Sequence, residues 1–186
     1  MKKKVVLLGD SIRLWGYGTK VPELLSEEYD VVQPEDNCRF TKYTLRGLFD
    51  WGELLRDADI IHWNNGLWDA TELFGDGTFT TEEEYISDIT RIARILKKIT
   101  PKVIFATTTP VWDEFEYTHN DKIDLYNEII VPVLEKEGVM INDIGFAVKS
   151  DIHKYVKECD KIHLSDEGID LCAKMVADAI RKIDAE

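Results

Sequence analysis

The sequence has few cysteines and a shortage of basic residues. Its 186 residues include 3 cysteines and no Cys-x-x-Cys pair, so neither a disulfide framework nor a thiolate zinc site is expected. Asp and Glu number 36 against 23 Lys and Arg, which gives a formal net charge of -13. Such a charge repels phosphate backbones and anionic membrane surfaces. Nucleic acids and membranes are therefore not expected as partners.

Long apolar runs are also lacking. No segment approaches the roughly 20 apolar residues of a membrane span. The N-terminal MKKKVVLLGDS begins with lysines, but its apolar run covers only residues 5–8 and no small-residue cleavage site follows. A chain that is not exported and resides in the cytoplasm is the simplest expectation. Since no linker, repeat or low-complexity tract divides it, we expect a single domain over residues 1–186.

Strand-like and helix-like segments alternate along the whole chain. The candidate strands are short and rich in Val and Ile: KVVLL, YDVVQ, ADIIHW, KVIFATT and GVMINDI. Residues 81–99 and 165–183 carry apolar side chains at helical spacing, and Ser165 is a plausible N-cap of the second helix. This alternation predicts an α/β fold with three layers, in which helices cover both faces of a doubly wound, five-stranded parallel sheet.

Polar groups follow several of these strands. GDSIR comes after the first strand, NNGLWD after the third, TTPVW after the fourth, and CDKIHLSDEG precedes the last helix. In an open α/β sheet ligands bind beyond the carboxyl ends of the strands, so these segments are expected to form the functional site.

Serine ester chemistry can be assembled from these segments. Ser11 would be the nucleophile, His163 the base that takes its proton, and Asp160 the carboxylate that orients His163. The side-chain amide of Asn64 or Asn65, together with the backbone amide of Ser11, can stabilise the oxyanion. The alternatives are structural: Ser11 can cap a helix, His163 can be a surface histidine, and either asparagine can stabilise a turn.

The segments LLGDSI, IIHWNNGLWD, TTPVW and DKIHLSDEG together resemble the SGNH hydrolases, also called GDSL esterases and lipases. The resemblance spans nearly the whole chain. It implies a flavodoxin-like fold, Ser11 as the nucleophile, Asp160 and His163 as acid and base, and no metal or organic cofactor.

The chain departs from the family pattern in two blocks. Instead of G-x-N-D the third block has WNNGLWD, which is similar to a branch with N-x-G-L-H-D and implies Asn64 rather than Asn65 as the oxyanion donor, with Trp68 in place of the histidine. The second block lacks its usual glycine. An alignment on Thr41 implies that the backbone amide of Arg39, or of neighbouring Cys38, replaces it.

Three further residues are candidates for the substrate pocket. Trp68 and Trp112 follow the third and fourth strands, and Arg13 follows Ser11 closely enough to bond a substrate oxygen. Core packing is the alternative for each tryptophan, and an ion pair for Arg13. His62, His153, Cys159 and His163 lack the spacing of a metal site, and FGDGTF is typical of a tight turn.

The expected function is ester hydrolysis, with a small-molecule ester as the only expected partner. The resemblance suggests an acetyl group carried on a carbohydrate, by analogy with carbohydrate esterases of the family. Acyl transfer with the same triad and an inactive glycan-binding domain are the alternatives. A flavodoxin-like nucleotide binder is disfavoured, because the chain is acidic and has no glycine-rich loop.

Overall fold

The computed structural model describes residues 2–186 and contains one five-stranded parallel sheet with the order β2-β1-β3-β4-β5. The strands are β1 (Lys3–Leu8), β2 (Tyr29–Val32), β3 (Ile60–Trp63), β4 (Val103–Ala106) and β5 (Met140–Asn142). All five lie within or overlap the strands predicted from the sequence. The predicted α/β class and strand number are therefore confirmed.

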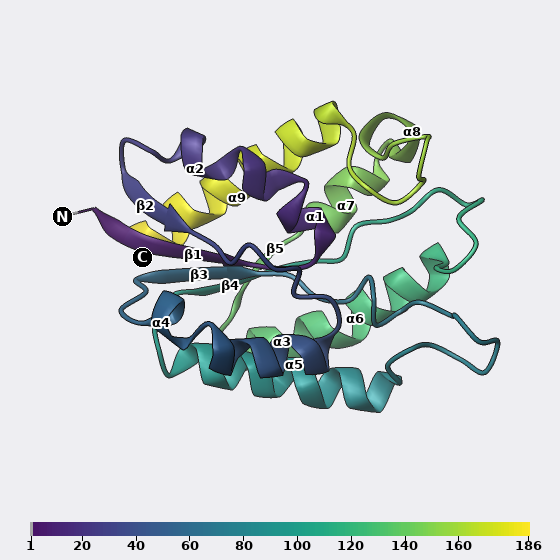
Figure 1. The fold of residues 1–186 in the computed structure, drawn as a ribbon, viewed down its shortest axis with the longest axis horizontal. Helices are drawn as coiled ribbons and strands as arrows, with labels where there is room; N and C mark the ends of the chain where they lie inside the picture. Colours follow the sequence, from purple (N-terminus) through teal and green to yellow (C-terminus); the bar gives the residue numbers. More distant parts are fainter. Residues whose placement is uncertain (1) are drawn as a thin grey trace.

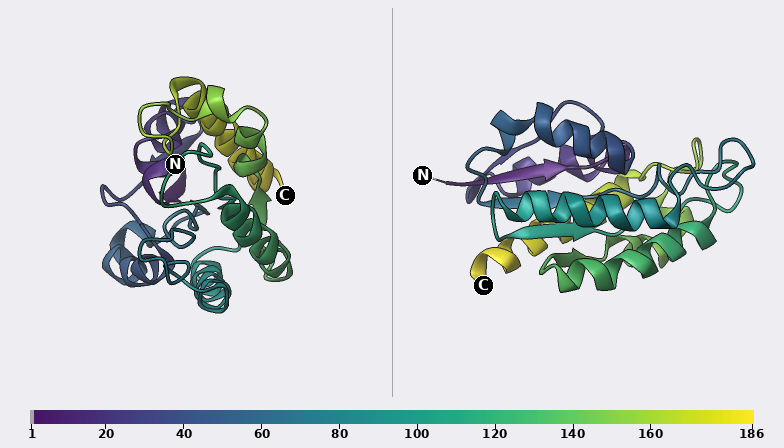
Figure 2. Two further views of the ribbon diagram at one scale, coloured as in Figure 1. Left: turned by 90° about the vertical axis from the view of Figure 1, so that its right-hand side faces the viewer. Right: turned by 90° about the horizontal axis from the view of Figure 1, so that it is seen from below.

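Helices cover both faces of the sheet (Figures 1 and 2). They are α1 (Ser11–Leu14), the 3-10 helix η1 (Tyr17–Thr19), α2 (Val21–Leu24), α3 (Thr41–Asp50), α4 (Gly52–Leu55), α5 (Glu82–Lys97), α6 (Asn120–Lys136), α7 (Ile144–Lys149), α8 (Ile152–Tyr155) and α9 (Asp166–Ala185). Figure 1 shows α2, α7, α8 and α9 on one face and α3 to α6 on the other.

The core is divided into two layers by the sheet itself. Val5 and Leu7 of β1 pack with α9, whereas Val6 and Leu8 pack with α3, α4, α5 and α6. Successive side chains of a strand point to opposite faces, so a strand buried on both sides is apolar throughout. This explains why the central strands lack the polar alternation of a half-exposed sheet.

The two long predicted helices are confirmed, and both begin at side-chain caps. The Ser165 hydroxyl accepts from the amide of Gly168 at the start of α9, as predicted. Thr81 and Glu84 form a reciprocal capping box at the start of α5.

The strand order places a topological switch point between β1 and β3. The connection from β1 leads to β2 on one side, while β3, β4 and β5 extend on the other. Leu8 and Trp63 are register partners at the ends of β1 and β3, so residues 9–11 and Asn64 emerge at the same level. Ligands of open α/β sheets bind in the crevice at such a point. Figure 2, left, looks onto the loops at this end.

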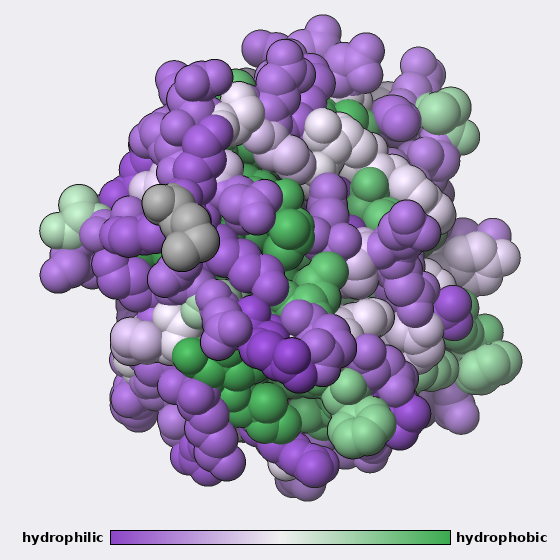
Figure 3. All heavy atoms as spheres, turned by 60° about the vertical axis from the view of Figure 1, so that its left-hand side comes forward, coloured by the Kyte–Doolittle hydropathy of each residue, from purple (hydrophilic) through white to green (hydrophobic). Residues whose placement is uncertain are grey.

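The opposite end of the molecule, where the N-terminus lies, is covered largely by hydrophilic side chains (Figure 3). That surface agrees with the excess of charged residues in the sequence. Within residues 2–186, none of the helices combines the length and the apolar character that crossing a bilayer requires.

Candidate active site

Ser11 stands where β1 turns into the four-residue helix α1. The helix is capped by the preceding residue: Asp10 Oδ1 accepts a hydrogen bond of 2.9 Å from the amide of Ile12. The Ser11 side chain is therefore not the N-cap. It is 4% exposed and lines a pocket at the carboxyl ends of the strands. Burial raises the pKa of Asp10, although the nearby Asn64 side chain and the hydrogen bond from Ile12 oppose this.

Asp160 and His163 are joined as the D-x-x-H spacing predicts. Asp160 Oδ2 lies 3.1 Å from His163 Nδ1. The other oxygen, Oδ1, accepts from the backbone amides of Ile162 at 3.1 Å and His163 at 2.9 Å. Partial burial of Asp160 favours its protonated form, but these hydrogen bonds outweigh the burial and hold its pKa below the ordinary value. Asp160 is thus a fixed carboxylate that orients the imidazole.

The loop that carries this pair is fastened at both ends. Val156 and Leu164 form an antiparallel bridge across its base, and the Lys157 amide donates to the His163 carbonyl at 2.8 Å. Trp112 adds two hydrogen bonds to this loop. Its backbone amide donates to the carbonyl of Lys161 at 3.0 Å, and its indole Nε1 donates to the carbonyl of Val156 at 3.1 Å. Trp112 was predicted as a pocket wall. The structure shows Trp112 holding the Asp160–His163 loop, and it is not among the residues that line this pocket.

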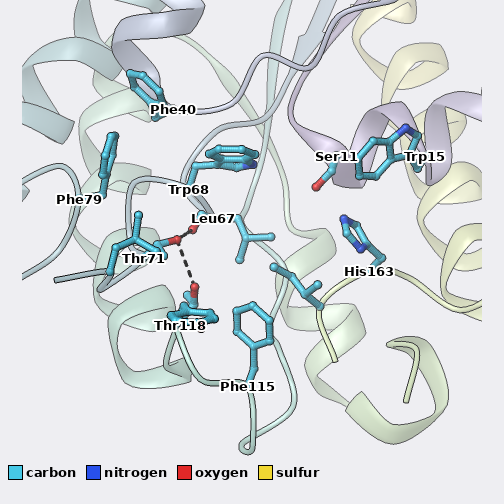
Figure 4. A pocket seen from close by; sticks show the side chains of 13 residues that line it. Ser11, Trp15, Phe40, Leu67, Trp68, Thr71, Phe79, Phe115, Thr118 and His163 are labelled. Carbon is cyan, nitrogen blue, oxygen red and sulfur yellow. Dashed lines mark hydrogen bonds between the residues drawn. The ribbon is translucent and has the colours of Figure 1, made fainter. Parts of the chain in front are cut away.

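Ser11 and His163 meet in one pocket. Figure 4 shows the Ser11 hydroxyl and the His163 ring beside one another, with Trp15 next to both. The Trp15 ring packs edge-on against His163, with centroids 5.2 Å apart and an interplanar angle of 65°. The Asp160 carboxylate and Trp15 therefore restrain the histidine from two sides.

Asn64 is held beside the turn after β1, which carries Ser11, by Tyr17. The Tyr17 hydroxyl donates to Asn64 Oδ1 at 2.8 Å, and both side chains are buried. Burial raises the pKa of Tyr17 well above its ordinary value, so the hydroxyl keeps its proton and acts as a donor. Gly9 makes room for this arrangement, because a Cβ at position 9 would overlap Asn64 Oδ1. With the carbonyl oxygen committed to Tyr17, the amide nitrogen is the end of the Asn64 side chain that remains to donate.

Asn65, the second choice for the oxyanion donor, is bound to neighbouring segments through both its side chain and its backbone carbonyl. It is fully buried, and its Nδ2 donates to the carbonyl of Arg39 at 3.0 Å. Its backbone carbonyl accepts from the hydroxyls of Tyr85 at 3.0 Å and Thr108 at 3.2 Å. Asn65 thus ties three segments together, which leaves Asn64 as the candidate donor.

The backbone amides of the second block already have acceptors. The Arg39 amide donates to Asn37 Oδ1 at 2.8 Å, and the Cys38 amide donates to the Gly9 carbonyl at 3.0 Å. Arg39 has a φ of 48°, in the left-handed region that favours glycine. The backbone there has the shape that the family glycine would give. In this conformation the amides of Arg39 and Cys38 both donate within the protein, so the proposal below assigns the oxyanion to Asn64 and Ser11.

Arg13, predicted to contact substrate, is instead fully buried. Its guanidinium donates to the carbonyls of Gly9 at 3.0 Å, Pro34 at 2.9 Å and Asp36 at 2.6 Å. It therefore fastens the segment after β2 to the nucleophile turn and does not line the pocket. Buried backbone carbonyls need donors, and one guanidinium supplies several.

The pocket has a volume of about 320 Å³ and an almost entirely apolar lining. Trp68 lines it, as predicted, and is 41% exposed. Sequence reasoning missed Phe40, Phe79, Phe115 and Tyr117, which also line it. Each of these residues lies in a loop that follows a strand, but no pattern in the sequence shows which of these loops face one another.

The residues considered for a metal do not gather. Within residues 2–186, no three His, Cys, Asp or Glu side chains are grouped so as to hold a metal ion. His62 is a fully buried core residue, and burial lowers its pKa to about 3, so its ring is neutral. His153 lies against the Trp112 ring, with centroids 4.3 Å apart.

No protein-family model and no curated protein sequence matches the chain. Solved structures, by contrast, are similar along almost its whole length. A lipase/acylhydrolase from Enterococcus faecalis has a TM-score of 0.80 at 18% identity and covers 97% of this chain and 96% of its own. The acetyl xylan esterase AlAXEase has a TM-score of 0.78 at 18% identity, and the match covers 95% of this chain and 99% of its own.

A third similar structure is a GDSL-like lipase from Bacteroides thetaiotaomicron, with a TM-score of 0.75 at 21% identity over 97% of this chain and 88% of its own. The chain therefore has the three-layer α/β fold of these GDSL-like lipases and acetyl xylan esterases.

Proposed function

We propose that this protein is a serine ester hydrolase. The observation that carries the proposal is the hydrogen-bonded Asp160–His163 pair, whose ring faces the same pocket as Ser11 at the switch point of the sheet. A nucleophile, a base and an orienting carboxylate are the groups that acyl chemistry requires. The esterases and lipases that share the fold support this assignment.

The reaction proceeds through an acyl-enzyme. The Ser11 oxygen attacks the ester carbonyl carbon while His163 takes the hydroxyl proton. The bond from carbon to the alkoxy oxygen then breaks, and His163 returns the proton to the departing alcohol. Water repeats the sequence on the acyl-enzyme, which releases the carboxylic acid and restores Ser11. Asp160 stays ionised and holds the imidazole in the tautomer that can accept the proton.

The side-chain amide of Asn64 stabilises the oxyanion in this mechanism, joined by the backbone amide of Ser11. Asn64 follows β3 as Ser11 follows β1, and these strands are neighbours. Its orientation is set before substrate arrives, because Tyr17 binds the carbonyl end of the amide. Fixed hydrogen-bond donors of this kind stabilise the transition state more than mobile donors do, because they need not reorganise as negative charge develops on the substrate oxygen.

The acyl group is a separate question from the reaction. The sequence suggested an acetyl group on a carbohydrate, and an acetyl xylan esterase is among the similar structures. A lipase/acylhydrolase and a GDSL-like lipase are similar to about the same degree. Similarity to these structures therefore does not decide the acyl group. The lining of the pocket is the better guide to it.

Covalent labelling tests the nucleophile directly. A fluorophosphonate should phosphonylate the Ser11 oxygen with loss of fluoride, because only a serine activated by a base reacts quickly. Peptide mass spectrometry should find the adduct on Ser11 and not on Ser26 or Ser165. Heat-unfolded protein, in which the triad is dispersed, should stay unlabelled. A label that is absent from the native protein, or equally present on the unfolded one, would contradict the proposal.

Tyr17→Phe is expected to lower kcat by about tenfold to a hundredfold and leave KM nearly unchanged, because Asn64 loses the bond that aims its amide. Steady-state kinetics on one ester measure both constants. The matched control is Tyr29→Phe, which loses a 3.1 Å bond to Asp184 away from the pocket. If both variants lose kcat equally, or neither does, Tyr17 has no role beyond packing.

A further inference from the structure

The pocket beside Ser11 is a cleft whose walls come from five segments: residues 11–15, 40, 67–79, 115–118 and 162–163. Trp15 is the C-cap of α1, Phe40 directly precedes α3, and Trp68 and Phe79 lie in the loop between β3 and α5. The rings of Phe40 and Phe79 pack edge-on, with centroids 4.9 Å apart. Figure 4 shows this pair at the far end of the cleft, with Trp68 between it and Ser11.

These walls leave large apolar surfaces open. Trp15 is 59% exposed, Trp68 41% and Phe79 45%. Soluble proteins rarely expose contiguous apolar patches without a binding role. Because this patch begins at the Ser11 hydroxyl, the molecule that covers it is the ester substrate.

The polar groups at the bottom of the cleft are bound to one another. The hydroxyls of Thr71 and Thr118 lie 3.2 Å apart, as the dashed line in Figure 4 shows, and Thr71 also donates to the carbonyl of Leu67 at 2.9 Å. A sugar brings several hydroxyls, each of which needs a partner when it leaves water. An alkyl chain needs none, so the lining favours an alkyl chain over a carbohydrate.

The geometry also separates the two sides of the ester. The departing alcohol must lie next to His163, which gives it a proton. Phe40 and Phe79 lie across the cleft from His163 (Figure 4). The end of the cleft that they close is therefore the acyl side.

Resting on the hydrolase assignment above, we propose that the cleft binds a neutral ester with a straight acyl chain of about six to eight carbons. At roughly 30 Å³ per methylene-sized group, 320 Å³ corresponds to about ten such groups, and part of this space is taken by the ester itself. An acetyl group would leave most of the cleft empty. Glu72, Asp76, Glu114 and Glu116 lie in the segments that form the walls, and the net charge of -13 disfavours anionic substrates.

A series of p-nitrophenyl esters from acetate to dodecanoate, kept below their aggregation limits, tests the chain length. Each buried methylene should raise kcat/KM by about threefold to fourfold. From acetate to hexanoate we expect an increase of about a hundredfold, a maximum at hexanoate or octanoate, and a decline for longer chains that extend beyond the cleft.

Phe79→Ala tests the position of the chain. Removal of this far wall should reduce the ratio of kcat/KM for octanoate to that for acetate by about tenfold. Phe74→Ala is the matched control, because Phe74 belongs to the same segment, is 80% exposed and does not line the cleft. Its ratio should equal that of the wild type. Circular dichroism establishes that both variants fold.

The outcomes separate the acyl-chain proposal from the hydrolase assignment. If turnover depends on Ser11 but acetate is the best substrate, the chain-length proposal fails and the hydrolase stands. If no ester is hydrolysed, the binding of ethyl octanoate and ethyl acetate to the Ser11→Ala variant is compared by tryptophan fluorescence, because Trp15 and Trp68 line the cleft. At least tenfold tighter binding of the octanoate supports the acyl cleft, and equal or absent binding overturns it.

Discussion

Ser11→Ala is expected to reduce kcat for hexanoate or acetate esters by about 10⁴-fold or more, with KM changed little. The substitution removes the attacking oxygen and nothing else from the pocket, so substrate still binds but no acyl-enzyme forms. The residual rate acceleration comes from the oxyanion donors and from substrate binding, and it is small beside the acceleration that an intact triad gives. Initial rates of p-nitrophenol release, with both proteins prepared identically, measure the loss.

The fold should survive this change. Ser11 is the first residue of α1, and the helix is capped by Asp10, so the variant keeps its cap. Ser165→Ala is an informative control, because this serine does cap a helix. Its loss should lower the free energy of unfolding by about 1 kcal/mol and leave kcat unchanged. If the wild type is no faster than Ser11→Ala on any ester, the site does not perform serine hydrolysis.

The sequence predicted those parts of the site that depend on local pattern. The apolar run of β1 ends at Gly9, so the position of Ser11 at the strand end followed from burial alone. The D-x-x-H spacing placed Asp160 and His163 within one turn of each other, and their 3.1 Å contact needs only the loop between them. For the same reason Ser165 was recognised as a cap from its position before a helical pattern.

Arg13 and Trp112, predicted as pocket residues, have hydrogen-bond partners that are far away in the sequence. The pattern around Arg13 gave no sign of its partners, because two of its three carbonyl acceptors belong to the segment after β2, more than 20 residues on. Trp112 bonds Val156 and Lys161, which no spacing rule connects to it. In both cases the side chain donates hydrogen bonds to backbone carbonyls of another loop. Those carbonyls need donors only once the two loops pack together in the fold.

The aromatic cleft was also beyond the sequence. Phe40 and Phe79 are separated by 39 positions and lie in two different loops, yet their rings are in contact. Neither residue belongs to a motif, and a loop pattern says nothing about which other loop it faces. The acetyl preference drawn from family analogy therefore had no information about this aromatic pair, on which the proposed acyl cleft depends.

Asp160→Asn is expected to lower kcat by about 10³- to 10⁴-fold at neutral pH, the second largest effect. Asp160 Oδ1 accepts two backbone amides, so an asparagine would turn its carbonyl oxygen to them and present its NH₂ to His163 Nδ1. The histidine would then carry its proton on Nε2, facing Ser11, and would be unable to accept the serine proton. Steady-state kinetics measure this loss of kcat.

Asp151→Asn is the matched control, because Asp151 also caps a short turn, with Oδ1 accepting from Lys154 at 3.2 Å, and it belongs to the same region. It should keep full kcat. Labelling with a fluorophosphonate separates the possible causes of a loss of kcat. Asp160→Asn should still bind substrate with an ordinary KM. It should react slowly with the fluorophosphonate, because Ser11 is present but not activated. Activity within tenfold of the wild type would show that the carboxylate of Asp160 does not set the tautomer of His163.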